Sequence, residues 1–135
     1  MLLPLPPARV RALSLENHLA LATVRAGHGN LDQMCCLLCV VYLAFYLRGE
    51  MVDGDNVEPY RRAEAALESS ITRMERQEPC LMRDQELAVV ERLLVLHDRQ
   101  LAGMPKHRYV LAWEQLQRFI ASQQRSPILQ NTAGH

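Results

Sequence analysis

Apolar residues recur along most of the chain at intervals of three and four positions, which is the spacing of one face of an α-helix. Turn-forming residues divide this pattern into five stretches, at about 7–26, 30–48, 56–77, 84–102 and 106–122. No stretch has the strict alternation of a half-buried strand, and no internal repeat is present. The pattern therefore predicts an all-α protein, a single compact bundle of four to five helices.

The stretch at about 30–48 is expected to form a buried central helix. Its uncharged apolar run from Met34 to Leu47 covers the whole circumference of a helix, so neighbouring helices are expected to enclose it. Asn30 is a suitable N-cap, and Gln33 stands three residues later, as in a capping box. A membrane-spanning helix requires about 20 apolar residues, so we expect no membrane insertion.

The other four stretches predict amphipathic helices. The first is either one helix from Pro7 or a short piece followed by a fresh start at Ser14. The residues expected to face the core from this stretch are Leu15, Leu19, Ala22 and Ala26. The three later stripes are expected to be Tyr60, Ala63, Leu67, Ile71 and Met74; Leu87, Val90, Leu94, His97 and Leu101; and Tyr109, Trp113, Leu116 and Ile120.

The domain is expected to span residues 1–122. Residues 123–135 lack a helical pattern and are expected to form a flexible tail. At the other end, Pro4, Pro6 and Pro7 interrupt the apolar run that an export signal requires, which predicts an extended lead-in and a cytoplasmic location.

Composition and charge are those of a globular domain, with 49% hydrophobic and 22% charged residues and 15 basic residues against 15 acidic ones. This balance argues against general nucleic-acid binding. The charge is nevertheless uneven, because residues 49–100 hold 7 basic and 12 acidic residues while both flanking regions are net basic. An acidic region at 49–78 is therefore a candidate contact for a basic partner, with ordinary solvated helix faces as the alternative.

Three of the four cysteines, Cys35, Cys36 and Cys39, lie inside the central apolar run and are expected to be buried apolar thiols. The pair Cys36 and Cys39 forms a CxxC, but it lies inside the helix instead of at its N-terminus, so burial is expected to raise the thiol pKa. Cys35 and Cys36 point about 100° apart, which disfavours a tetrahedral metal site with His97. We expect no metal, no cofactor and no catalytic residue, with a zinc or redox site as the alternative.

The lack of a catalytic constellation predicts a small non-catalytic cytosolic protein that acts by protein–protein interaction, as a regulator, inhibitor or adaptor. It would use its helix faces and the acidic region 49–78. The candidate partner-binding residues are Met51, Val52, Asp53, Asp55, Glu64, Glu68, Leu81 and Met82. The two glutamates are expected to share one exposed face. The strongly apolar central helix also predicts self-association, as a possible homodimer.

A DNA-associated transcriptional regulator is the alternative function. The stretches 84–102 and 106–122 are joined by a turn of the length found in a helix-turn-helix. Lys106, His107 and Arg108 stand at the start of the second stretch, where a recognition helix reads bases. The zero net charge and the early apolar residues of that helix weigh against nucleic acid as a partner.

Overall fold

The computed structural model describes residues 3–50, 56–78, 82–123 and 125–128. Its helices are α1 (Pro7–Arg25), α2 (Leu31–Tyr46), the short 3₁₀ helix η1 (Arg48–Glu50), α3 (Glu58–Glu75), α4 (Asp84–Leu101) and α5 (Lys106–Ser122). Over these ranges there is no β-strand beyond one isolated bridge between Pro4 and Pro105. The predicted all-α bundle is confirmed.

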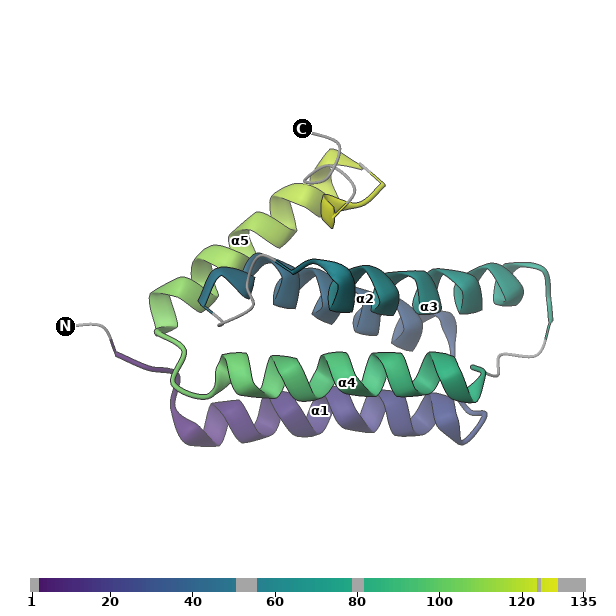
Figure 1. Cartoon of the computed structure of the whole chain (residues 1–135), viewed down its shortest axis with the longest axis horizontal. Helices are drawn as coiled ribbons and strands as arrows, with labels where there is room; N and C mark the ends of the chain where they lie inside the picture. The colour runs from purple at the N-terminus through teal and green to yellow at the C-terminus, as the bar shows by residue number, and fades with distance from the viewer. Residues whose placement is uncertain (1–2, 51–55, 79–81, 124, 129–135) are drawn as a thin grey trace.

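Helices α1 to α4 form a ring in which each packs against the next and α4 returns to pack against α1 (Figure 1). Successive helices run in opposite directions, as the loops between them require. Helix α5 packs mainly against α2 and rises away from the other four helices (Figure 1). Helix α2 packs against α1, α3, α4 and α5, so its predicted central position is confirmed.

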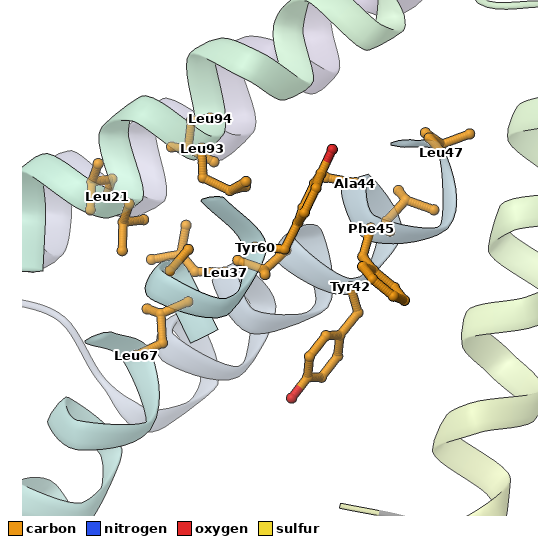
Figure 2. Packing of buried hydrophobic residues seen from close by; sticks show 14 of the residues in the cluster. Leu21, Leu37, Tyr42, Ala44, Phe45, Leu47, Tyr60, Leu67, Leu93 and Leu94 are labelled. Carbon is orange, nitrogen blue, oxygen red and sulfur yellow. The ribbon is translucent and has the colours of Figure 1, made fainter. Parts of the chain in front are cut away.

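The core lies between α2, α3 and α4. Leu37, Tyr60 and Leu93 come from these three helices and belong to one buried cluster (Figure 2), and each side chain is at most 2% exposed. The rings of Tyr60 and Phe45 meet edge to face, with their centroids 5.8 Å apart. Burial of each such side chain stabilises the fold by about 1.5–3 kcal/mol, before the entropic cost of ordering the chain.

The start of α2 has the capping box that the sequence predicts. The Asn30 side chain accepts a hydrogen bond from the Gln33 backbone N–H at 2.9 Å, and the Gln33 side chain accepts one from the Asn30 N–H at 3.0 Å. These two bonds satisfy donors that a helix N-terminus leaves unpaired.

The expectation that α2 is buried on all sides is wrong for its N-terminal half. Residues 41–45 are all buried, but Cys35 and Cys36 are exposed. Helix α5 covers the C-terminal half, where Phe119 packs edge to face on Tyr42 at 5.4 Å. Because α5 does not cover the first turns of α2, one face there stays open.

Helix α1 is one continuous helix, which settles the alternative that the sequence left open. Its predicted core face is wrong. Leu15 and Leu19 are 60% and 55% exposed, whereas Leu21 and Val24 are buried. The helix has two apolar faces, and only contact with α2 and α4 selects between them. In this orientation Arg25 forms an exposed ion pair with the Glu91 carboxylate of α4, at 3.0 Å.

The predicted stripes of α3 and α4 face the core, with Ile71 and Met74 only partly buried. A bidentate ion pair between Arg73 and Glu86 joins the two helices, with its shorter contact at 2.6 Å. Burial acts to raise the pKa of Glu86, but the hydrogen bonds from Arg73 and from the Arg83 backbone outweigh it and lower that pKa.

In α5 the predicted stripe is right for Tyr109 and Leu116 and wrong for Trp113 and Ile120, which are 36% and 48% exposed. Ala112 is buried in their place. The helix buries a narrow stripe because it packs mainly against a single neighbour, and its flanks therefore stay in solvent.

Residues 3–5 and residues 126–128 are both attached to the bundle. The Leu5 N–H donates to the Met104 carbonyl at 2.9 Å, and the Lys106 N–H donates to the Leu3 carbonyl at 2.8 Å. This confirms an extended lead-in. Residues 126–128, which were expected to belong to the flexible tail, are instead buried, and Ile128 has no exposed surface.

The two faces of α1 predict opposite responses to one substitution. Leu21→Ala is expected to lower the free energy of unfolding by about 2–5 kcal/mol, because it removes packed methyl groups from the core. Leu15→Ala is expected to change it by less than about 0.5 kcal/mol. Urea unfolding at low protein concentration, where self-association is negligible, measures both. Equal losses would contradict this orientation of α1.

Candidate protein-binding groove

A groove of about 980 Å³ lies between α1 and α5, with one face of α2 from Asp32 to Leu43 as its floor. Both walls pack on α2, and α5 diverges from α1 along its length (Figure 1). The floor presents Cys36, Cys39 and Val40. The walls present apolar side chains that include Leu13 of α1 and Trp113 of α5. The result is an open apolar trough beside a fully packed core.

The rim of this groove is polar. Arg9 and Glu16 line it from α1, and Asp32 lines it from the first turn of α2. All three are exposed. Arg9 also lines a smaller hollow beside Trp113 and Arg118 of α5, so the positive end of the rim lies next to the indole. An apolar floor with a charged rim is the usual anatomy of a protein-binding surface.

Two of the thiols that line the groove, Cys35 and Cys39, have raised pKa values. Burial, aided by the charge of Asp32, raises the pKa of Cys35, and burial raises the pKa of Cys39. The direction at Cys39 is as the sequence predicts. A raised pKa keeps a thiol protonated at neutral pH, and the protonated thiol is not a nucleophile. The expectation that all three thiols are buried is wrong, because Cys35 and Cys36 are exposed and Cys39 is only half-buried.

His97 of α4 lies under the groove and is 2% exposed. Its Nδ1 is hydrogen-bonded to the Gln100 side-chain oxygen at 2.8 Å, and the Gln100 amide donates to the Ala44 carbonyl of α2 at 2.9 Å. Burial lowers the pKa of His97, which keeps the imidazole neutral. Its contacts are structural, since they fasten α4 to α2.

The most deeply buried carboxylate is on α3. Glu64 is 4% exposed and accepts hydrogen bonds at 2.6 Å from the hydroxyls of both Tyr42 and Ser126. The hydrogen bond from Ser126 attaches residues 125–128 to the bundle. Burial, with the hydrogen bond to Glu64, raises the pKa of Tyr42 far above its ordinary value.

The candidate partner-binding residues lie apart from the groove where they are described. Glu64 is in the interior, so it does not share an exposed face with the half-buried Glu68. Met82 is 7% exposed and packs into the core. The remaining five, Met51, Val52, Asp53, Asp55 and Leu81, lie outside the described residues.

Much of the acidic charge on α3 is matched locally. Glu58 pairs with Arg61 at 3.0 Å and with Arg62 at 3.8 Å. Glu64 is buried. The described part of the region 49–78 therefore offers less unpaired negative charge than a residue count implies.

Within the described ranges, no group of three or more histidine, cysteine, aspartate or glutamate side chains is placed to hold a metal ion. None of the helices described combines the length and apolar content needed to cross a bilayer. Comparisons with protein-family models, with curated proteins and with solved structures find no match to this chain. The function therefore has to be argued from the groove and the surfaces around it.

Sequence reasoning did not find the groove. Its floor reads as part of a buried apolar run, and only the divergence of α5 opens it. A partial signal is present in α5, where apolar residues such as Val110, Leu111 and Trp113 outnumber what a helix with one neighbour can bury.

The Tyr42–Glu64 contact predicts a specific loss of stability at alkaline pH. The pKa of Tyr42 is higher in the folded chain than its ordinary value of about 10, so its contribution is present below pH 10. It is lost as the pH rises further, because only the unfolded chain then releases the phenol proton. Tyr42→Phe is expected to cost about 1.5–3 kcal/mol at pH 7, since it removes a bond to a charged acceptor. Above pH 10 the free energy of unfolding of Tyr42→Phe should fall less steeply with pH than that of the wild type.

Ser126→Ala is the matched control, because it removes the other bond to Glu64 without removing a phenol. Urea unfolding between pH 7 and pH 11 should show a lower free energy of unfolding for this variant but an alkaline decline parallel to that of the wild type. Parallel declines for all three proteins would contradict the role of Tyr42.

Proposed function

We propose that this protein is a non-catalytic binding protein that accepts an amphipathic helix of another protein in the α1–α2–α5 groove. The observation that carries the proposal is the groove itself, an apolar trough between two helices with a third helix as its floor. Recognition of a helix in a groove requires this shape. Such a contact suits a regulator, an inhibitor or an adaptor.

The dimensions of the floor indicate the size of the occupant. The floor extends from Asp32 to Leu43. At a rise of 1.5 Å per residue this is about 16 Å, or three helical turns. A helix of that length presents apolar anchors at positions i, i+4 and i+7. Trp113 is the natural centre of the contact, because a half-exposed indole at the edge of a pocket is a frequent source of binding energy.

The charges of the rim indicate the chemistry of the occupant. Glu16 and Asp32 are acidic and exposed, whereas Arg9 lies toward the Trp113 end. The occupant is therefore an amphipathic helix with basic residues beside its apolar stripe at the Asp32 end. Charge matching of this kind favours the correct partner and the correct direction of docking. In this proposal the rim takes over the role that the sequence assigned to the acidic region 49–78.

The proposed location is the cytosol. Cys35 and Cys36 are exposed on the floor of the groove, and a reducing compartment keeps such thiols from forming disulfides with other proteins. The alternative of DNA recognition receives less support. A helix-turn-helix needs its two helices to act as one packed unit, whereas α5 packs mainly against α2 instead of α4.

Two substitutions on opposite flanks of α5 test the proposal. A displayed library of amphipathic helical peptides, selected against the folded protein, supplies the ligands. Trp113→Ala is expected to weaken selected peptides with basic flanks at least about tenfold, because it removes the central anchor. Leu111→Ala, which removes a 46% exposed side chain outside the groove, should leave affinity within about twofold.

Isothermal titration calorimetry measures both affinities, and circular dichroism verifies that both variants keep the helical fold. Glu16→Lys should also weaken the basic peptides and should spare peptides with neutral flanks. The proposal fails if the library yields no peptide that binds, or if Leu111→Ala and Trp113→Ala have the same effect.

A further inference from the structure

A second hollow, of about 790 Å³, lies between the start of α3 and one face of α4. These two helices run side by side in opposite directions (Figure 1). Glu58, Pro59 and Arg62 line the hollow from α3, and a face of α4 from Ala88 to Arg99 forms the rest of its wall. It shares no lining residue with the α1–α2–α5 groove. This α3–α4 hollow is therefore a separate surface of the molecule.

The α4 wall of the hollow carries an apolar line and a basic line. Val89 and Leu96 stand seven residues apart and form the apolar line. Arg92 and Arg99 have the same spacing and form the basic line. Seven residues make about two helical turns, so each line extends about 10 Å along the helix and the two lines lie next to each other. Val95, which is 41% exposed, adds apolar surface on the other side of the basic line.

The hollow presents positive charge because its carboxylates already have partners. Glu58 pairs with Arg61 at 3.0 Å, and Glu91 pairs with Arg25 of α1 at 3.0 Å. Both arginines of the basic line are exposed, and neither forms an ion pair within the ranges that the structure describes. A free guanidinium beside apolar surface can bind a carboxylate through two parallel hydrogen bonds.

We propose that the α3–α4 hollow binds an amphipathic helix of a partner protein whose apolar stripe is flanked by acidic residues. The bound helix lies along α4. Its apolar side chains, seven residues apart, contact Val89 and Leu96, and carboxylates with the same spacing pair with Arg92 and Arg99. A helical occupant fits because its repeat along the axis equals that of α4. The unpaired positive charge of the basic line requires that the flank be acidic.

The charge preference distinguishes this hollow from the α1–α2–α5 groove. The groove has Glu16 and Asp32 on its rim and favours a basic helix, whereas the hollow favours an acidic one. Like charges placed opposite each other weaken binding, so neither helix fits well at the site of the other. Because the two sites share no lining residue, the docking of an acidic helix stands independently of the proposed function.

Loss of the basic line tests the charge requirement. A displayed library of amphipathic helical peptides with glutamate flanks, selected against the folded full-length chain, supplies the probes. Arg92→Gln with Arg99→Gln is expected to weaken the selected peptides at least about tenfold, because it removes both cations of the contact. Arg11→Gln with Arg76→Gln removes the same charge from two exposed positions outside the hollow and the groove, and should leave affinity within about twofold. Isothermal titration calorimetry measures the affinities, and circular dichroism verifies the fold.

Two matched valines test where the peptides bind. Val95→Glu places a negative charge beside the basic line and should weaken the same peptides at least about tenfold. Val110→Glu makes the same change at a 42% exposed position of α5, in the smaller hollow that Arg9 and Arg118 also line, and should leave affinity within about twofold. Equal losses in the two variants, or a loss confined to Val110→Glu, would overturn the proposal.

A charge exchange tests direct contact. Arg92→Glu with Arg99→Glu should bind a version of the selected peptide with lysine in place of glutamate at least about tenfold more tightly than the wild type binds that version. Equal affinity of this variant for the two versions overturns the proposal, and so does a library that yields no binder. Binding of the wild type to phosphatidylserine vesicles in place of any peptide would assign the basic line to a membrane surface and would also overturn it.

Discussion

The structure depends on the unequal covering of α2. Residues 41–45, in its C-terminal half, are all buried, and Phe45 is only 2% exposed. Its N-terminal half has α1 and α3 beside it but lacks α5, whose Phe119 instead packs on Tyr42 in the C-terminal half. One helix therefore supplies both the anchor of the core and the apolar floor of the groove. The packed core stabilises the fold, and this stability allows the apolar floor of the groove to remain open to solvent.

Polar contacts between helices hold this arrangement, because apolar packing alone would allow one helix to slide along its neighbour. The Gln100 amide fixes α4 to the Ala44 carbonyl of α2, and Arg73 fixes α3 to Glu86 of α4. In the interior, Glu64 accepts hydrogen bonds from the hydroxyls of Tyr42 and Ser126. A buried carboxylate is costly unless its partners are in place, so these bonds favour one packing over its neighbours in register.

The sequence predicts the helices well because their ends depend on local chemistry. Asn30 with Gln33 starts α2, and Gly27 and Gly103 adopt φ values of +85° and +77° after α1 and α4, as turn glycines do. It predicts the faces of α3 and α4 because each has a single apolar stripe. It fails on α1, where Leu15 and Leu21 belong to two competing apolar faces of similar quality. Local periodicity holds no information on which face meets α2 and α4, and the groove depends on that same tertiary choice.

The central claim is that the first turns of α2 are open to solvent in the folded protein. Thiol labelling of the native chain under increasing denaturant, with the modified residues mapped by mass spectrometry, tests it most directly. Cys35 and Cys36 are predicted to react with a small reagent at a rate that does not change below the unfolding transition, since no opening is needed. A labelling rate for Cys36 that rises with denaturant in parallel with global unfolding would mean that the floor is closed, and would contradict the account.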